Sequence, residues 1–315
     1  MRERDSAIAL TLLSSFFWGS SFVAADYGVR ILHPVLYLAL RFAIAAPMGV
    51  ALVWHSREGM RNVMGDWRIW ALGALNAVAF AMQYVGLEYT TATKAALLVH
   101  MNIVIVAILS VVLMRERMSW KIGLAVVVGT AGVSLVSIGD AMASPGGLAS
   151  IWQGGSIVGD LLNVGAGCVW AFFIIFTKKV LNDPARKRSP DAVTGALAMT
   201  TLLPLSLMSL AFPWGGTPST DIILLATYLA FFCTILAYLL WSCGLKHLSA
   251  TATSLLVLME LLFAAILAAI LLGDTLTPVS WAGAGLIAVA AVLAALSESN
   301  KGISPIKDAV NRNPP

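Results

Sequence analysis

Long apolar segments follow one another along the whole chain, and only short polar stretches separate them. A helix of about 20 apolar residues is long enough to cross the hydrocarbon core of a bilayer. The pattern therefore predicts an all-α membrane protein with ten transmembrane helices. We expect the spans at residues 6–26, 34–54, 67–87, 93–114, 119–138, 156–176, 191–212, 221–244, 250–272 and 278–296.

The first span has an alternative interpretation. Arg2 and Arg4 precede it, as basic residues precede the apolar core of a secretory signal. Its length, and its likeness to a second tryptophan-centred segment at residues 160–176, favour a membrane helix.

A segment in the first half of the chain, residues 83–121, returns in degraded form at residues 241–279. Both copies begin with Gly-Leu and end in a charged turn, which indicates a duplicated module. A shift of 158 positions sets Gly86-Leu87 on Gly244-Leu245, Leu97-Leu98-Val99 on Leu255-Leu256-Val257, and Ala107-Ile108-Leu109 on Ala265-Ile266-Leu267.

Each half of the chain holds five of the expected spans. Because five is odd, the second half enters the membrane upside down, and the two halves form inverted five-helix repeats. Inverted repeats are typical of secondary transporters, whose substrate site lies near the midplane between the halves. We expect the repeats at residues 1–138 and 156–296. A Gly/Ser/Pro-rich periplasmic or extracellular linker at 139–155 joins them, and a disordered cytoplasmic tail follows at 297–315.

Charged residues are scarce and unevenly distributed. They make up 11% of the chain, and the mean hydropathy is +0.87. With the N-terminus inside, 17 of the 20 Lys and Arg residues fall in inner segments. Basic residues concentrate on the cytoplasmic side, so we expect a multi-pass protein of the cell (inner or plasma) membrane with both termini cytoplasmic. The net charge of +4 then reports orientation, and no nucleic-acid partner is expected.

Motifs for catalysis are missing from the sequence. It contains no His-Glu-x-x-His metal motif, no Gly-x-Ser-x-Gly elbow and no Walker motif. The three cysteines, Cys168, Cys233 and Cys243, all lie in apolar segments, so neither a disulfide framework nor a metal site is predicted. We expect a protein that is not an enzyme and needs no cofactor or metal. A sensor or scaffold on a transporter-like fold is the alternative.

Polar and aromatic side chains at helical spacing mark candidate cavity residues, since residues seven apart share a helix face. A shift of 152 positions sets Trp18 on Trp170. Asn76 and Gln83 share one face, and Trp241 stands in the second half where Gln83 stands in the first. These residues could line a substrate cavity. Alternatively, the tryptophans fill the helix core and the amides bond to neighbouring helices.

Three further candidates lie in the second and fourth spans. Arg41 is about 10 Å from the outer end of its span; it could contact substrate, extend outward or pair within the bundle. His100 and Asn102 lie about 200° apart on a continuous helix. At least one of them is therefore expected to face a neighbouring helix instead of a cavity.

Glu260 is the sharpest candidate for substrate binding or coupling, because it falls near the centre of its span. An ionised carboxylate is costly there. We expect it to be protonated for part of the cycle, neutralised by Lys94 or Arg41, or exposed to a wet cavity. Asn102 is its counterpart in the first half and cannot titrate. A structural role, as a protonated donor to a neighbouring helix, is the alternative.

The Trp-Gly-Ser-Ser-Phe segment at residues 18–22, the Arg41-Phe42-Ala43 segment and the two repeats resemble the drug/metabolite transporter superfamily, and within it the ten-helix EamA-type permeases. Residues 113–119 and 271–277 are similar to that family's Leu-Leu-Gly-Glu-x-Leu-Ser/Thr ending. The resemblance covers residues 7–296. It implies an exporter or exchanger of small metabolites, with a cavity lined mainly by spans one, three, four, six, eight and nine, and with spans five and ten peripheral.

The chain departs from this family in the middle of spans four and nine, where the family usually has Glu-Pro. Here the positions are Asn102-Ile103 and Glu260-Leu261, so both kink prolines are absent and one Glu remains.

A carboxylate, several Trp faces and a basic partner suit an amphipathic zwitterion such as an amino acid. Trp faces also attract organic cations, so efflux of cationic drugs or amines is the alternative. The expected partners are the lipid bilayer and a small-molecule substrate, with protons added if Glu260 couples transport. A monomer and a homodimer both remain open.

Overall fold

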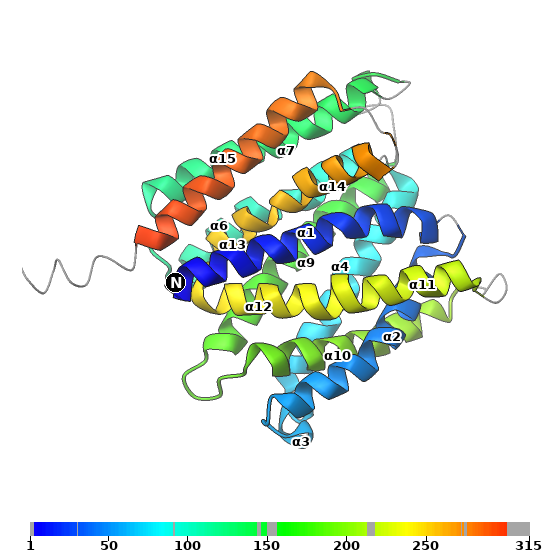
Figure 1. The fold of residues 1–315 in the computed structure, drawn as a ribbon, viewed down its shortest axis with the longest axis vertical. Helices are drawn as coiled ribbons and strands as arrows, with labels where there is room; N and C mark the ends of the chain where they lie inside the picture. Colours follow the sequence, from blue (N-terminus) through cyan, green and yellow to red (C-terminus); the bar gives the residue numbers. More distant parts are fainter. Residues whose placement is uncertain are drawn as a thin grey trace, which may run out of the picture.

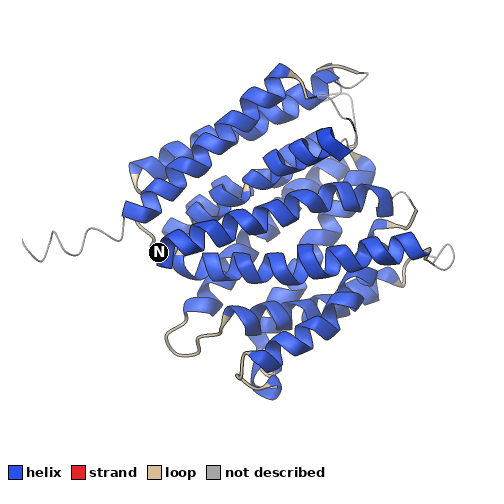
Figure 2. Cartoon of the chain, in the orientation of Figure 1, coloured by secondary structure: helices blue, strands red, loops and turns tan. Residues whose placement is uncertain are grey.

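The fold is a bundle of long helices, described here from a computed structural model (Figure 1). The structure describes residues 3–29, 31–90, 92–143, 146–149, 156–212, 218–271, 273 and 276–300. Within these residues there are ten helical segments long and apolar enough to cross a membrane. Figure 2 shows helices joined by short loops, with no strand in the described part of the chain. The expected all-α fold with ten spans is confirmed.

Six helices and one short connecting helix make up the first half. They are α1 (Glu3–Val29), α2 (Pro34–His55), α3 (Met60–Met64), α4 (Trp67–Tyr89), α5 (Ala92–His100), α6 (Asn102–Met114) and α7 (Trp120–Ala143). The second half contains α9 (Ile157–Asn182), α10 (Pro190–Ser209), α11 (Thr220–Tyr228), the π-helix η1 (Leu229–Leu236), α12 (Ala237–His247), α13 (Ala250–Val257), α14 (Met259–Leu271) and α15 (Pro278–Asn300).

Serine residues begin four spans of the second half. The side chains of Ser156, Ser189, Ser219 and Ser249 each accept a hydrogen bond from the backbone N–H three residues on. A serine in this position satisfies one of the N–H groups that a helix start leaves without an internal partner. The sequence therefore sets where these helices begin.

Two helices run further than the sequence indicated. Helix α7 continues through Ala143, past Gly139, where the linker was expected to begin. Helix α15 continues to Asn300 and so includes the first residues of the expected tail. Residues 144–145, 150–155 and 301–315 of the expected linker and tail lie outside the described residues.

Spans four and nine are interrupted although neither contains a proline. Helix α5 ends at His100 and α6 begins at Asn102, and α13 ends at Val257 while α14 begins at Met259. The carbonyl of Leu256 would accept from the Glu260 N–H in a continuous helix; here it accepts the Ser15 hydroxyl at 3.2 Å. At this interruption the Ser15 hydroxyl of α1 thus replaces a backbone N–H as the donor to the Leu256 carbonyl.

The helices pack in the same way in both halves. Helix α1 packs against α12, α13 and α14, while α9 packs against α4, α5 and α6. Helix α7 packs against α15 at one edge of the bundle, and α2 packs against α10 at the opposite edge (Figure 1). The first span of each half therefore lies against the third and fourth spans of the other. This arrangement is compatible with an inverted repeat.

Reciprocal glycines bring the edge helices together. A Cβ on Gly49 would meet the Gly195 carbonyl, and a Cβ on Gly195 would meet the Gly49 carbonyl. Gly132 and Gly283 make the same mutual contact between α7 and α15. Small residues let membrane helices approach closely enough for backbone packing, so both edge pairs depend on them.

Both described ends of the chain lie at one end of the bundle, which we call the N-terminal end. The Ser299 hydroxyl donates to Asp5 at 3.1 Å, and the Arg4 guanidinium donates to the Glu298 carbonyl. Exposed tryptophans stand at helix ends on this side: Trp54 is 83% exposed, Trp67 70% and Trp120 73%. Amphipathic aromatic rings favour the membrane–water boundary, so these residues mark where the apolar bundle meets the interface.

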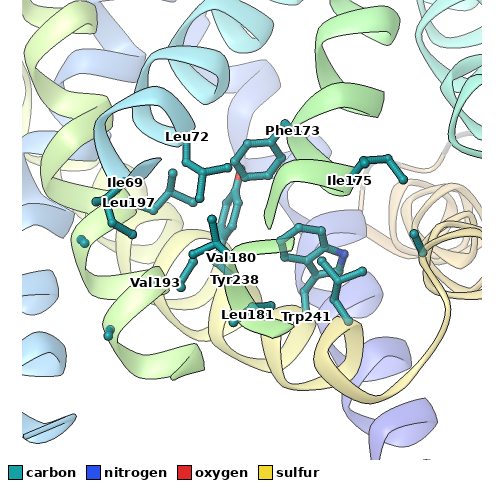
Figure 3. Packing of buried hydrophobic residues seen from close by; sticks show 14 of the residues in the cluster. Ile69, Leu72, Phe173, Ile175, Val180, Leu181, Val193, Leu197, Tyr238 and Trp241 are labelled. Atoms are coloured by element: carbon teal, nitrogen blue, oxygen red, sulfur yellow. The ribbon is translucent and has the colours of Figure 1, made fainter. Parts of the chain in front are cut away.

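An aromatic and aliphatic core lies between the halves (Figure 3). Phe173 from α9 and the pair Tyr238 and Trp241 from α12 pack against aliphatic side chains of α4 and α10. Packing of these large side chains stabilises the junction, because each aromatic side chain buries about 150–250 Å² of surface against its neighbours.

Candidate functional site

An ionisable pair joins the two halves at their helix interruptions. The His100 Nε2 atom lies 3.1 Å from Glu260 Oε1, and both side chains are largely buried. His100 is the last residue of α5, and Glu260 is the second residue of α14. The pair therefore connects the broken spans four and nine.

Of the possibilities considered for Glu260, neutralisation by Lys94 or Arg41 does not occur in this structure. Lys94 lies 2.5 Å from Asp160 on α9, and Arg41 donates to a threonine and a backbone carbonyl. Neither reaches Glu260, because each is held by a nearer acceptor on another helix. His100 takes that place.

The interruption also changes the geometry of His100 and Asn102. A separation of about 200° holds only for a continuous helix, but α5 ends at His100 and α6 begins at Asn102, with Met101 between them. The two side chains are therefore not held about 200° apart on one helix. His100 faces the other half of the protein, and Asn102 begins α6.

Small or hydroxylated residues flank both interruptions at equivalent positions. Ser15 of α1 bonds to the Leu256 carbonyl beside the second interruption. The 152-residue shift sets Ser15 on Gly167 of α9, where a Cβ would lie 2.9 Å from the Val99 carbonyl beside the first interruption. Each half thus supplies a residue from its first span to the broken span of the other.

Arg41 is held inside the bundle and does not extend to the surface. It is 3% exposed. Its Nε donates to Thr234 Oγ1 at 2.6 Å, and its Nη2 donates to the Cys233 carbonyl at 2.8 Å. The π-helix makes this carbonyl available, because the Ala237 N–H, its partner in a regular α-helix, bonds to Phe232 instead.

Trp18 and Trp241 belong to one aromatic group. Trp18 Nε1 donates to the Cys233 carbonyl at 3.1 Å, and its ring lies 6.0 Å from Trp241 and 5.3 Å from Tyr238. Trp241 stacks on Phe173 with an interplanar angle of 8°. These contacts join α1 and α12 to α9.

Trp170 and Gln83 form a second polar and aromatic contact between the halves. Trp170 Nε1 donates to Gln83 Oε1 at 3.0 Å, and the Trp170 ring meets Phe80 edge-on at 5.0 Å. Phe80 also lies under the Arg41 guanidinium, 5.6 Å from its Cζ. Cation–π attraction at this distance adds to the hydrogen bonds that hold Arg41.

Asn76 is fully buried and bonded on both sides of its amide. Its Nδ2 donates to Thr201 at 3.0 Å, and its Oδ1 accepts from the Tyr238 hydroxyl at 2.8 Å. A satisfied buried amide of this kind fixes helix packing. In this conformation Asn76 connects α4 to α10 and α12.

Sequence reasoning missed Tyr238, which touches more of the candidate residues than any it named. Tyr238 contacts Asn76, Trp18 and Trp241. Helical spacing contained a usable signal, since Tyr238 follows Thr234 by four residues and shares its face.

A network of charges ties the halves together at the N-terminal end. The fully buried Asp66 pairs with Arg68 at 2.8 Å and with Arg188 at 3.1 Å, and Arg188 also reaches Glu58 at 3.1 Å. Hydrogen bonds from the Arg68 side chain lower the pKa of Asp66 to about 2, against the opposing effect of burial. This network links the α3–α4 connection to the α9–α10 connection.

Metal binding has no support in the described part of the chain, where no three His, Cys, Asp or Glu residues gather closely enough to hold an ion.

Comparison with known sequences identifies the family. The sequence profile of the EamA-like transporter family matches residues 5–138 and 157–296. The chain belongs to the EamA-like transporter family.

Individual EamA-like relatives cover nearly the whole chain. An uncharacterized transporter from Archaeoglobus fulgidus is 30% identical over 83% of this chain and 86% of its own length. A probable amino-acid metabolite efflux pump from Salmonella typhimurium is 27% identical over 91% of this chain and 93% of its own length. A crystal structure that is 17% identical superposes with a TM-score of 0.78, covering 94% of this chain and 99% of the other, and shows the same fold.

The EamA-like chain is thus a transporter and a multi-pass membrane protein. Its candidate site joins an ionisable pair, a buried guanidinium and several Trp rings at the junction of two five-span halves.

Proposed function

We propose that this EamA-like transporter is a secondary exporter or exchanger of a small amphipathic zwitterion, such as an amino acid. It works by alternating access between its two halves. Both termini face the cytoplasm, and the protein resides in the cell inner or plasma membrane.

The observation that carries this proposal is the meeting of opposite charges in an aromatic interior. Arg41 and Trp18 donate to the same Cys233 carbonyl, and Gly19, the next residue of α1, lies against the Glu260 backbone. A zwitterion needs one partner for its ammonium group and one for its carboxylate. Trp18, Trp170 and Trp241 supply apolar faces for a side chain.

A relative supports the same substrate class. The Salmonella typhimurium protein, 27% identical to this chain, is named a probable amino-acid metabolite efflux pump. Its similarity extends over 91% of this chain and 93% of its own length.

Efflux of organic cations is the second candidate. Glu260 and the Trp rings would serve it, since a carboxylate and aromatic faces both attract cations. Under this alternative Arg41 would have only a structural role, and its hydrogen bonds to Thr234 and Cys233 are consistent with that.

Counterflow in proteoliposomes distinguishes these candidates. Vesicles containing the purified full chain are loaded with unlabelled leucine, phenylalanine or tryptophan and then offered the labelled amino acid outside. We expect saturable uptake of label that empty vesicles lack. Exchange of tetraphenylphosphonium with no amino-acid exchange would establish the cation alternative, and exchange of neither would refute both.

A further inference from the structure

The hydrogen bonds of His100 determine where its protons lie. Nδ1 is 2.7 Å from the Ala96 carbonyl, which can only accept, so Nδ1 carries a hydrogen. The Nε2–Oε1 contact with Glu260 then needs one further proton. That proton is either on the ring, giving imidazolium and carboxylate, or on the carboxyl group, giving two neutral partners.

The helix ends favour the charged arrangement. His100 lies in the last turn of α5, where the helix dipole presents its negative end, and Glu260 lies in the first turn of α14, where it presents its positive end. A cation is stabilised at the first position and an anion at the second. The interruptions at Met101 and Leu258 create both of these helix ends within the bundle.

Few other ionisable groups face the pair. The Tyr238 hydroxyl of α12 donates to Asn76, and Arg41 of α2 donates to Thr234 and to the Cys233 carbonyl. The acidic side chains that the structure describes on the helices packed against α5 and α14 have partners elsewhere: Asp160 with Lys94, Glu88 with His33, Asp140 with Ser280, Glu298 with Ser249, Asp5 with Ser299, and Glu3 with His247. Among these described groups, the proton between His100 and Glu260 is the one shared across the junction.

We propose that His100 and Glu260 form a one-proton site between the halves, and that this proton is the one the transporter couples to substrate movement. The coupling rests on the proposed transport function; the proton site does not. The pair is intact only while the last residue of α5 and the first turn of α14 lie close together. When the halves separate during alternating access, the imidazolium loses its carboxylate and passes the Nε2 proton to water, leaving neutral His100 and ionised Glu260.

Nitrogen-15 NMR of the four histidines tests the proton site without any substrate. The full chain is labelled at histidine and studied in detergent micelles, and the His100 signal is the one that His100→Gln removes. At neutral pH we expect protons on both His100 nitrogens in the native protein and on one in Glu260→Gln. Equal protonation of His100 in the two proteins would overturn the proposal.

A second His–Glu pair provides the matched control. His33 Nε2 lies 3.4 Å from Glu88 Oε1 outside the junction. Glu88→Gln should leave the His100 signal unchanged, and Glu260→Gln should leave the His33 signal unchanged. Loss of the His100 imidazolium in Glu88→Gln would point to a general loss of folding and would contradict the assignment.

Accumulation against a gradient tests the coupling. With the membrane potential clamped, a pH difference of one unit sustains about a tenfold concentration ratio if one proton moves per substrate. We expect this ratio for leucine in native proteoliposomes, and a ratio of one in His100→Gln after its own leucine exchange has reached a plateau. Accumulation by His100→Gln as strong as in the native protein refutes the coupling. Absence of leucine exchange in every protein refutes the proposed function, while the NMR result stands by itself.

Discussion

Trp18 and Arg41 donate hydrogen bonds to the same acceptor, the carbonyl of Cys233, at 3.1 and 2.8 Å. The two donors come from the first and second spans, and the acceptor comes from the π-helix in the eighth. A single backbone oxygen thus holds two helices of the first half against one helix of the second. Trp18 belongs to the aromatic residues that we propose contact substrate, and Arg41 lies over Phe80, which packs against Trp170.

Loss of both donors should cost more than the sum of the two single losses. In Trp18→Phe or Arg41→Gln the Cys233 carbonyl keeps one partner, but in the double variant it has none. A buried acceptor without a partner costs about 1–3 kcal/mol, so we expect a coupling of about 1–2 kcal/mol in the free energy of unfolding. Denaturant titration in micelles measures it. Arg41→Gln with Trp70→Phe is the control, and it should be additive because Trp70 donates to the Met64 carbonyl.

Gly19 should not tolerate a methyl group. A Cβ at this position would lie 2.7 Å from the Glu260 carbonyl, so Gly19→Ala pushes α1 away from α14. We expect a loss of stability of about 1–3 kcal/mol and a fall in exchange rate, because Glu260 moves with its backbone. Gly285→Ala on α15 meets nothing within 4 Å and should be neutral or stabilising. A melting temperature for Gly19→Ala at or above that of Gly285→Ala would contradict this packing.

Acid should weaken the charge network at the N-terminal end. Chiefly the Arg68 hydrogen bonds hold the pKa of Asp66 near 2, below its ordinary value of 3.8. A carboxyl group with a lowered pKa stabilises the fold above the unfolded pKa, and that contribution is lost as the pH falls from about 4 to about 2. Asp66→Asn can still cap α4, so its stability should be lower at pH 6 and flatter across this window. Thermal unfolding in micelles between pH 6 and 2 measures how steeply the stability of the native protein and of Asp66→Asn falls with pH.

Thiol labelling in intact cells tests the proposed orientation. In a variant with Cys168, Cys233 and Cys243 replaced by Ala, we introduce Cys at Ala149, between the halves, or at Ala185, between α9 and α10. Both positions are exposed. An impermeant maleimide should label Ala149→Cys in intact cells and Ala185→Cys only after lysis. The reverse pattern would place both termini outside.

The sequence by itself determined the spans and the family resemblance, for a local physical reason. A stretch of apolar residues near 20 long has to become a membrane helix, because a backbone in lipid must satisfy its hydrogen bonds internally. The serines at positions 156, 189, 219 and 249 likewise set helix starts through contacts three residues away. Trp18, Trp170, Gln83 and Glu260 could be singled out because helical spacing is also local.

Tertiary structure alone decided which of these residues meet. His100 and Glu260 are 160 positions apart, and Arg41 and Thr234 are 193 apart, so no local pattern connects them. The interruptions at Met101 and Leu258 have no proline to announce them. They arise where Ser15 and Gly167 of the first spans bring another helix against the backbone. A carboxylate in an apolar span needs a partner, but which cation supplies it depends on how the two halves pack.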